Sequence, residues 1–474
     1  MQHPEVLTLL PQTGEKTLSG VFLLPTGRAH LVGIAGSGLR SLAEVLLGWG
    51  WTLSGSDLTT ETLGKLATRG VQLHRGHAAG HVPPEADLVI ASDAIEPANP
   101  ELAEARRLGV PVLSYFQALG QLMAGRQGVA VAGTHGKSTT TAMLAHLLTA
   151  AGRDPTVVCG AAPLGHENGG RPGRSSLMVV EACEYRANFL HLCPQQAAIL
   201  GIEPDHFDCY PSLERLTEAF TRFAERIPEN GLLVARHECA VTRQVAIRTR
   251  GRVETFGLDD EADWSARELT QEAGRYNFAL FRHQHRLDRV CLQVPGRHTV
   301  LNALAAAALA WDVGLTAAEI AAGLASFAGL HRRLETLGSW HDVIWLDDYA
   351  HHPTEITATL ATVRQMHPGR RVWCVFQPHQ ASRTEHLLDE LAASLQNADK
   401  LVVADIFRAR EPAPRPGEVT AADLAERARR LGVEVADVQA TAAIVACLKA
   451  QVRPGDVVIT MGAGDIGRIH QNRF

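Results

Sequence analysis

The segment 128–141, GVAVAGTHGKSTTT, constrains the fold more than any other part of the chain. Its apolar run 129–132 predicts a buried parallel strand, and residues 138–150 predict a helix with apolar side chains on one face. A glycine turn between strand and helix directs backbone N–H groups and the helix N-terminus toward one point, which favours anions. Lys137 adds a positive charge there, and Ser138 offers a hydroxyl to Mg²⁺. The segment therefore predicts a phosphate-binding turn.

This turn is shorter than the full P-loop pattern. The full pattern has a glycine five residues before Gly136, and Val131 occupies that position. A Gly-Lys-Ser turn that arose by chance and binds nothing remains the alternative. The order strand, turn, helix favours the phosphate site.

Composition narrows the class of protein. The 474 residues allow two to four domains, and the net charge of −6 argues against a nucleic-acid-binding surface. We expect no signal peptide and no membrane contact, because no basic run leads into an apolar segment and no apolar run is long enough to span a bilayer. The eight cysteines contain no C-x-x-C pair and indicate core thiols in a reducing cytoplasm.

Residues 1–28 show little periodicity and are predicted to be an N-terminal extension. The first domain, 29–127, alternates strands and helices, with strands at 30–34, 51–54, 71–74 and 87–91, which indicates an open parallel sheet. Gly36 and Gly38, followed by Asp57 about twenty residues later, resemble the dinucleotide-binding fingerprint. Ser41 replaces its third glycine, so a tight turn without a ligand remains possible.

The second domain, 128–329, places polar groups after two buried strands. One strand leads to Glu181, and the next leads to the segment 203–206 that ends in His206. The carboxyl ends of parallel strands are where open α/β sheets bind ligands. Ser138, Glu181 and His206 are therefore candidate Mg²⁺ ligands. A helix cap or ion pair remains open for Glu181, and a satisfied loop histidine for His206. Residues 237–295 are predicted to be strands with long, Arg-rich connections.

The third domain, 330–474, is predicted to be another parallel α/β unit. Arg332 and Arg333 near its start can reach phosphates, although an Arg-Arg pair is as often a solvated face. Titratable residues gather after two of its strands, which indicates a site: Asp347, Asp348, Tyr349, His351, His352 and His379. No paired spacing supports zinc.

In this order and spacing, the motifs resemble the Mur ligases over residues 30–474. The segments that carry the resemblance are GIAGSG at 33–38, SGSD at 54–57, GTHGKS at 133–138, EACE at 181–184, EPDH at 203–206, PGRHTVLN at 295–302, RR at 332–333, DYAHHPTE at 348–355, QPH at 377–379 and GAGDI at 462–466. The resemblance implies an α/β protein with three domains. These are a Rossmann-like N-terminal domain that binds a UDP-sugar, a P-loop-type central domain that binds ATP, and a Rossmann-like C-terminal domain.

Among these ligases, the chain is most similar to those that add L-alanine to UDP-N-acetylmuramate. The implied reaction uses ATP and Mg²⁺ to convert the lactyl carboxylate to an acyl phosphate, which the amine of L-alanine attacks. It is the first peptide step of peptidoglycan precursor synthesis. The implied partners are these small molecules, with no nucleic acid and no membrane, and the chain is expected to be a monomer or homodimer.

The resemblance also assigns residues by motif. The implied catalytic residues are Lys137, Glu181, His206, His351 and Arg383. The implied ATP site comprises Gly133, Thr134, His135, Gly136, Lys137, Ser138, Thr139, His298, Asn302 and Arg332. The implied UDP-sugar site comprises Gly33, Ala35, Gly36, Ser37, Gly38, Leu39, Ser56 and Asp57. The implied amino-acid site comprises Tyr349, His351, His379 and Arg383, and the implied metal ligands are Ser138, Glu181 and His206.

Three departures and two rival functions qualify this assignment. Leu200-Gly201 replaces the usual Thr-Asn, Thr299 replaces a common Asn, and Gln380 stands where an arginine is usual, so Arg383 would bear more of the carboxylate recognition. One rival is another ligase of the superfamily, which recycles murein tripeptide or extends folate. The other is a UDP-sugar-binding protein without catalysis, against which the intact Lys137, Glu181 and His206 argue.

The distribution of lysine bears on the metal site. No lysine occurs from Ser138 to Asp399. Several Mur-type ligases are expected to use a carbamylated lysine in the middle domain to hold a second Mg²⁺. This chain has only Lys137 there, which favours the alanine-adding type and predicts no dependence on bicarbonate.

Overall fold

The computed structural model describes residues 26–60, 63–409 and 411–472, which form two compact units. The first unit comprises residues 26–35 and 46–122, and the second comprises residues 36–45 and 123–472. Residues 1–25 of the predicted extension lie outside the described residues. Among the described helices, none combines the length and the apolar character needed to cross a membrane.

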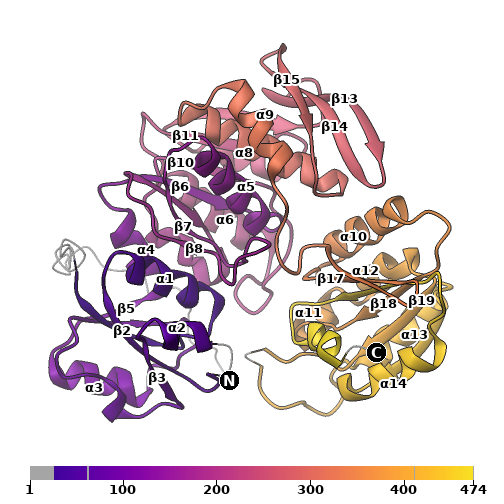
Figure 1. The fold of residues 1–474 in the computed structure, drawn as a ribbon, viewed down its shortest axis with the longest axis horizontal. Helices are drawn as coiled ribbons and strands as arrows, with labels where there is room; N and C mark the ends of the chain where they lie inside the picture. Colours follow the sequence, from indigo (N-terminus) through magenta and orange to yellow (C-terminus); the bar gives the residue numbers. More distant parts are fainter. Residues whose placement is uncertain (1–25, 61–62, 410, 473–474) are drawn as a thin grey trace. The chain divides into compact units, whose positions relative to one another are not determined.

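The first unit contains a five-stranded parallel sheet in the order β3-β2-β1-β4-β5 (Figure 1). The elements of this part of the chain are β1 (Arg28–Val32), α1 (Ser37–Gly48), β2 (Thr52–Asp57), α2 (Gly64–Thr68), β3 (Gln72–Arg75), η4 (Ala79–His81), β4 (Leu88–Ala91), α3 (Pro100–Leu108), β5 (Val112–Ser114) and α4 (Tyr115–Met123). Helix α3 begins where Asn99 accepts a hydrogen bond from Glu101 N, and it ends at Gly109 with φ 73°. The predicted Rossmann-like domain is confirmed.

The second unit contains two sheets. The larger has ten strands in the order β15-β14-β13-β12-β11-β10-β6-β9-β7-β8. Its elements are β6 (Gln127–Ala132), α5 (Lys137–Ala150), β7 (Thr156–Val158), β8 (Gly170–Arg171), β9 (Leu177–Glu181), η5 (Tyr185–His191), β10 (Gln196–Ile199), α6 (Leu213–Ala224), β11 (Leu232–Arg236), α7 (Ala240–Ala246), β12 (Arg252–Gly257), β13 (Trp264–Glu272), β14 (Arg275–Arg282), β15 (His285–Cys291), α8 (Arg297–Asp312) and α9 (Ala317–Ser326). The pairs β13–β14, β14–β15 and β7–β8 are antiparallel, and the others are parallel.

The prediction of long, Arg-rich connections over 237–295 holds between β11 and β12, where Arg243, Arg248 and Arg250 occur, and was wrong between β13 and β15. This segment includes helix α7, and β13 to β15 are joined by two-residue turns (Figure 1). Both residues of each turn have positive φ, at Ala273 and Gly274 and again at His283 and Gln284. That geometry matches the twist of a tight hairpin. The second turn lacks the usual Asn-Gly signal, so the sequence pattern did not predict it.

The core of the ten-stranded sheet is formed around α8. The alanines of α8 are almost fully buried, and together with Leu144 and Leu147 of α5 they belong to one hydrophobic cluster. Small side chains permit the close approach of helix to helix and helix to sheet. This packing holds the start of α5, and hence the phosphate turn, on a rigid base.

The second sheet of this unit has six strands in the order β16-β17-β21-β18-β19-β20. Its elements are β16 (Glu335–Trp340), β17 (Val343–Asp348), α10 (Pro353–Met366), β18 (Val372–Phe376), α11 (Ala381–His386), α12 (Leu388–Ser394), η6 (Leu395–Asn397), β19 (Lys400–Ala404), α13 (Ala421–Arg430), β20 (Val435–Gln439), α14 (Thr441–Gln451), β21 (Val457–Met461) and η7 (Ile466–Asn472). All pairs are parallel except the hairpin β16–β17. Separate hydrophobic clusters form around this sheet, one with residues of α10, α12 and α13 and one with residues of α14 and η7, as expected for a doubly wound sheet.

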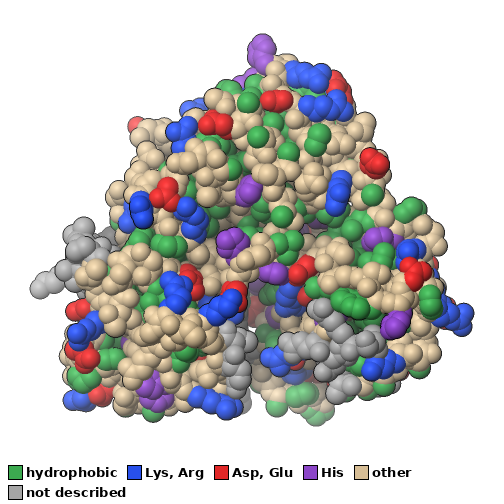
Figure 2. Space-filling view, in the orientation of Figure 1, with side chains coloured by type: hydrophobic (Ala, Val, Ile, Leu, Met, Phe, Trp, Pro, Cys, Tyr) green, Lys and Arg blue, Asp and Glu red, His purple; other side chains and the backbone are tan. Residues whose placement is uncertain are grey.

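Apart from Arg28 at the start of β1 and Gln127 at the start of β6, each sheet lies within one of the three predicted domain ranges. The boundaries 29–127, 128–329 and 330–474 stay predictions. Figure 2 shows one face of the molecule, on which Lys and Arg side chains are interspersed with Asp and Glu side chains. No single-sign patch dominates that face, in keeping with the small net charge of −6.

Candidate active site

The phosphate turn lies between β6 and α5. Gly133 and Gly136 have φ of 131° and 78°, which glycine adopts readily. A Cβ on Gly133 would lie 2.8 Å from Leu200 N, and one on Gly136 would lie 2.4 Å from Asn302 Oδ1. Neither position has room for a side chain, so the turn is a cradle built from backbone, which suits phosphate oxygens.

The ammonium group of Lys137 folds back over this cradle. Its Nζ donates to Gly133 O at 2.6 Å, to Thr134 O at 3.1 Å and to Glu184 Oε1 at 3.0 Å. Burial alone would lower the pKa of Lys137, but the carboxylate of Glu184 raises it above its usual value. Lys137 is therefore a fixed positive charge at the turn.

Hard oxygen donors lie beside it. Ser138 Oγ donates to Glu181 Oε1 at 2.9 Å, and Glu181 Oε2 accepts from Gly160 N at 2.7 Å. His206 Nε2 lies 3.2 Å from Glu184 Oε1, so Glu184 connects His206 to Lys137. A hydroxyl and a carboxylate this close form a donor set that fits Mg²⁺. The metal assignment of Ser138, Glu181 and His206 stays a prediction.

His135 contributes a second positive charge to the turn. Its ring nitrogens lie 3.2 Å from Glu355 Oε1 and 3.4 Å from Glu203 Oε2, and its ring is 4.6 Å from that of His352. Burial lowers the pKa of His135, but the two carboxylates raise it to about 9. His135 is therefore an imidazolium at neutral pH that ties the turn to α10.

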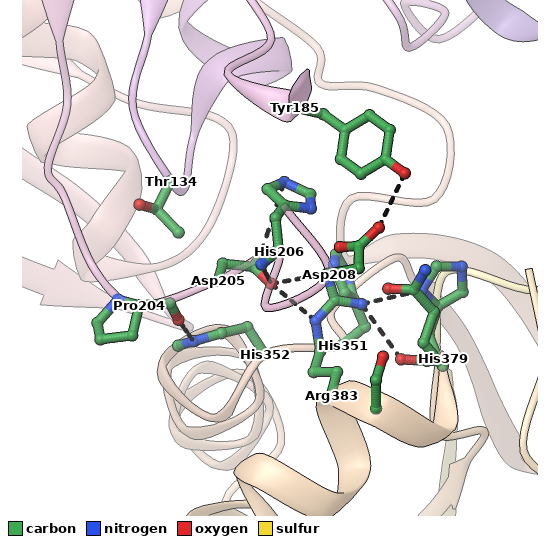
Figure 3. Close-up of polar contacts among 12 residues, drawn as sticks. Thr134, Tyr185, Pro204, Asp205, His206, Asp208, His351, His352, His379 and Arg383 are labelled. Carbon is green, nitrogen blue, oxygen red and sulfur yellow. Dashed lines mark hydrogen bonds and ion pairs between the residues drawn. The ribbon is translucent and has the colours of Figure 1, made fainter. Parts of the chain in front are cut away.

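Other polar contacts also join the two sheets (Figure 3). In Figure 3, His352 Nε2 lies 3.2 Å from Pro204 O. In addition, Thr354 Oγ1 donates to Glu203 Oε2 at 2.6 Å. These contacts bring the EPDH segment after β10 against the HHPTE segment at the start of α10. The sequence motifs are thus assembled in one place within the second unit.

The predicted amino-acid residues gather around Arg383. Its Nε and Nη2 lie 2.8 Å and 2.7 Å from Asp205 Oδ1, and its Nη1 contacts His379 Nδ1 at 2.9 Å (Figure 3). Arg383 is buried. Burial would raise the pKa of Asp205, but its neighbours His206 and Arg383 lower that pKa well below its usual value. In this structure the partner of Arg383 is thus an internal carboxylate. Its role toward L-alanine stays a prediction.

Tyr349 and His351 lie next to this group. His351 Nδ1 is 3.0 Å from Tyr349 O, its ring is 5.6 Å from that of His379, and burial lowers the pKa of His351 to about 4. It is therefore a neutral imidazole. Gln380, at the position usually occupied by arginine, donates its amide to Ala409 O at 3.2 Å.

The two arginines near the start of the third domain have different positions. Arg332 donates to Gly462 O at 2.7 Å and pairs with Asp347, so it is held by its own sheet. Arg333 Nη2 lies 3.4 Å from Ser138 Oγ. The prediction chose Arg332 for ATP. The structure places Arg333 nearer the phosphate turn; the sequence analysis named it beside Arg332 as able to reach phosphates but did not assign it to the ATP site.

A cavity of about 590 Å³ opens beside the turn. His135, Gly136, Thr139, His298, Asn302 and Arg333 contribute to its lining. Burial lowers the pKa of His298 to about 4, and its Nδ1 is buried without a hydrogen-bond partner among the described residues. An unpartnered buried nitrogen in a cavity is suited to a polar ligand edge. Thr299, which stands where asparagine is common, donates its Oγ1 hydrogen to Gly296 O at 2.6 Å.

The first unit holds several of the predicted UDP-sugar residues. Ala35 N donates to Asp57 Oδ2 at 2.9 Å, and Gly33 has φ 85° at the end of β1. Ser56 is buried and donates to Glu101 Oε2 at 2.5 Å. The other predicted residues belong to the second unit: Gly36 directly precedes α1, and Ser37, Gly38 and Leu39 form its first turn.

Sequence reasoning left several charged residues of these sites out of the site assignments: Glu101, Glu184, Asp205, Arg333 and Glu355. Glu184, Asp205, Arg333 and Glu355 stand inside motifs that were recognised, which was the available signal. Glu101 lies outside every such motif.

Comparison with known proteins identifies the class. The chain matches the family models described as Mur ligase family, catalytic domain, over residues 28–127, as Mur ligase middle domain over 131–310, and as Mur ligase, glutamate ligase domain, over 332–464. The chain therefore belongs to the Mur ligase family, and the resemblance inferred from its motifs is confirmed.

Individual relatives show which types of Mur ligase the chain is similar to. The chain is 39% identical over 445 residues to a UDP-N-acetylmuramate–L-alanine ligase of Clostridium novyi, covering 93% of this chain and 96% of the relative. Its structure is similar to that of the UDP-N-acetylmuramate–alanine ligase MurC of Thermotoga maritima, with TM-score 0.79, 28% identity and coverage of 94% and 98% of the two chains. It is also similar to a murein peptide ligase of Psychrobacter arcticus, with TM-score 0.72, 26% identity and the same coverage.

Proposed function

We propose that this chain is an ATP-dependent ligase that joins L-alanine to the lactyl carboxylate of UDP-N-acetylmuramate. The observation that carries the proposal is the backbone cradle with Lys137, Ser138 and Glu181 at the edge of a large cavity. High identity to alanine-adding ligases over nearly the whole chain supports the same activity. The proposed location is the cytoplasm, where ATP and nucleotide sugars are available.

The residues at the turn suit phosphoryl transfer. Negative charge on the transferred phosphoryl group must be stabilised by positive groups that are already in place. Lys137 and the imidazolium of His135 provide two such charges on the same turn, and Arg333 provides a third near Ser138. The nucleotide base would occupy the cavity beside His298 and Asn302.

Mg²⁺ fits the oxygen donors described above. Ser138 and Glu181 would hold it, with His206 as a further candidate, and when bound it would neutralise charge on the phosphate oxygens. Glu184 holds Lys137 and His206 in position from the other side. The ion pairs with Glu184 therefore orient the ammonium group of Lys137 and the candidate metal ligand His206 before a substrate binds.

The amino-acid end supplies neutral and cationic groups. The acyl phosphate carbon is attacked by an uncharged amine, which forms the amide and releases phosphate. The neutral imidazole of His351 can accept a hydrogen bond from that amine. Arg383 is the proposed partner of the alanine carboxylate, and it must exchange Asp205 for the substrate to take that role.

A murein peptide ligase is the second candidate, favoured by the structural similarity to that enzyme of Psychrobacter arcticus. One assay separates the candidates. Phosphate release is followed with ATP, Mg²⁺ and UDP-N-acetylmuramate, together with either L-alanine or murein tripeptide. Release with L-alanine supports the proposal, and release only with tripeptide supports the second candidate. UDP-sugar binding without phosphate release from either acceptor would indicate a non-catalytic binding protein.

A further inference from the structure

Two histidines and two glutamates meet where the two sheets of the second unit contact each other. One ligand atom each of His135, Glu203 and His352 lies within 4.8 Å of the others. His135 belongs to the phosphate turn, Glu203 follows β10, and His352 directly precedes α10. Glu355, in the first turn of α10, also contacts His135. Two imidazoles and a carboxylate at these distances form a ligand set that suits transition metals.

This group differs chemically from the candidate magnesium ligands. Ser138 and Glu181 offer oxygen atoms, which suit Mg²⁺. Imidazole nitrogen suits Zn²⁺ and other transition metals better than Mg²⁺. His135, Glu203 and His352 are not among the candidate Mg²⁺ ligands, so the two sets share no residue.

His135 is oriented as a metal-binding histidine would be. Its Nε2 is buried and makes no hydrogen bond to the described residues, although Glu203 Oε2 lies only 3.4 Å away. Its Nδ1 lies 3.2 Å from Glu355 Oε1. A histidine that binds metal through one nitrogen usually donates its other N–H to a carboxylate, and Glu355 occupies that position here. A metal ion at Nε2 would replace the proton there and would be attracted by the carboxylate of Glu203.

His352 presents a lone pair on Nδ1. Its Nε2 lies 3.2 Å from Pro204 O, and a carbonyl oxygen can only accept, so Nε2 carries the proton. Burial lowers the pKa of His352, so the ring is neutral at neutral pH. Nδ1 accepts from Thr354 N at 3.4 Å. A hydrogen bond of this length is weak, so a metal ion can take its place.

Solvent can reach this group. The side chains of His135 and Glu203 are 21% and 34% exposed, whereas His352 is buried. An ion can therefore enter beside the first two and bind the third. The three ligands come from separate motifs, which explains why the sequence shows no paired zinc spacing.

We propose that His135, Glu203 and His352 bind a transition-metal ion, foremost Zn²⁺, with water in the fourth position of a tetrahedral site. The bound ion would connect the phosphate turn, the segment after β10 and the start of α10. It would thereby hold the two sheets of the second unit together. This site is additional to the proposed ligase activity and does not depend on it.

The test is zinc binding by the full chain in excess Mg²⁺, measured by competition with a chromogenic chelator. Excess Mg²⁺ keeps the oxygen donors occupied. The wild type is expected to bind a single zinc ion at this site, and zinc should raise its Tm, because a ligand that binds only the folded state stabilises it. His352→Gln should raise the Kd for zinc about tenfold or more, since loss of even an outer partner of a metal ligand has an effect of that size. It should also remove most of the zinc-dependent rise in Tm.

The control is His237→Gln. It removes the histidine of the other group with metal-ligand spacing among the described residues, which also contains Asp259 and Glu261. This variant should keep the zinc affinity and the Tm rise of the wild type. Loss of zinc binding in His237→Gln would assign the ion to that other group and would overturn the proposal.

Other results would also overturn it. These are the absence of zinc binding by the wild type, complete displacement of zinc by Mg²⁺, and an unchanged Kd in His352→Gln. If His352→Gln fails to fold, the partly exposed Glu203→Gln replaces it and should weaken zinc binding similarly. The titration contains no ATP, UDP-sugar or amino acid, so a failure here leaves the proposed function untouched.

Discussion

The two units bury carboxylates in different ways. In the first unit, Glu101 is held by His30, Ser56 and His81, which all belong to one sheet and the segments that follow its strands. In the second unit, two of the pairs join side chains from different sheets. Glu355 meets His135 across 220 residues of sequence, and a separation of 178 residues divides Asp205 from Arg383. The first network is complete once one sheet has folded, and the second needs two sheets to meet.

The carboxylates of the two units also differ in the chemical type of their partners. Glu101 is surrounded by imidazoles and a hydroxyl, which can orient a ligand without a large fixed charge. The carboxylates of the second unit face Lys137, Arg383 and the imidazolium of His135. Phosphoryl transfer requires strong fixed charges. The cationic partners in the second unit therefore suit the proposed phosphoryl transfer, whereas the first network directs hydrogen-bond donors at a single carboxylate.

The largest effect is expected from a substitution that disrupts only the charged network of the second unit. Lys137→Ala should lower kcat by about 10²–10³-fold or more, because it removes a preorganised positive charge from the transferred phosphoryl group. UDP binding, measured by calorimetry, should stay normal, because Lys137 lies in the predicted ATP-binding domain, whereas the predicted UDP-sugar residues lie in the range of the first predicted domain. Lys65→Ala on α2 is the control and should leave turnover unchanged. Near-normal phosphate release by Lys137→Ala would show that this turn is not the catalytic cradle.

The next effect tests the contact between the two sheets. Arg383→Ala should raise the KM for L-alanine by about 10–100-fold through loss of a charge-assisted contact, with a much smaller change for ATP. It should also destabilise the fold by about 3–5 kcal/mol, because Asp205 would be left buried and unpaired.

The double variant Asp205→Asn/Arg383→Ala separates these two effects. Removing the stranded charge should restore much of the thermal stability but not the KM for L-alanine. Arg364→Ala, which breaks the more exposed pair with Asp399, is the control. Equal changes in the KM of L-alanine and ATP would remove Arg383 from carboxylate recognition.

A smaller effect is the pH dependence of stability, which should differ between the His135 network and the Glu101 network. The pKa of His135 is raised to about 9, so its stabilisation is complete below its ordinary value near 6.5 and is lost as pH rises through 9. The pKa of Glu101 is lowered to about 2, so its stabilisation is present above about 4.5 and is lost as pH falls toward 2. The second unit should therefore weaken on the alkaline side and the first on the acidic side.

Thermal unfolding of the wild type and His135→Gln from pH 6 to pH 10 measures the alkaline effect. The stability difference should be about 2–3 kcal/mol at pH 6 and should shrink as the pH passes 9. His166→Gln, an exposed histidine, is the control. A difference that is constant over this range would show that His135 is not an imidazolium in the folded protein.

Local sequence patterns predicted most of the fold. They did not predict contacts between residues of different sheets. Alternating strands and helices predicted the parallel sheets, and one strand-turn-helix segment placed Lys137 and Ser138, because those contacts are close in sequence. The pairing of Arg383 with Asp205 depends on how two sheets meet, which no local pattern contains. The same holds for the closer approach of Arg333 than Arg332 to Ser138.

Glu101 was missed for another reason. As an acidic residue in the first turn of a helix, it has an ordinary explanation in helix capping and the helix dipole. Its histidine partners lie on β1 and after β3, and they become a cluster only when these strands are neighbours of β2 in one sheet. A buried charge is visible only once the packing is known.

The last prediction is that bicarbonate has no effect on activity. It concerns Lys137, the only lysine of the predicted middle domain. A carbamate forms when CO₂ reacts with an uncharged amine, and a second Mg²⁺ held by a lysine carbamate would require one here. No lysine lies between Ser138 and Asp399, and Lys137 donates to Gly133 O, Thr134 O and Glu184. Its raised pKa keeps the amine protonated, so it cannot react with CO₂ at neutral pH.

Activity should therefore be independent of bicarbonate. Degassed, bicarbonate-free enzyme is assayed for phosphate release, and bicarbonate is then added back at fixed pH and ionic strength. The expected ratio of the two rates is one, because any further metal ligand must be a carboxylate, histidine, water or substrate oxygen, with Glu184 and His206 the nearest candidates beside Glu181. A reversible rise in rate on adding bicarbonate would contradict this, and it would mean that Lys137 leaves Glu184 and becomes uncharged during turnover.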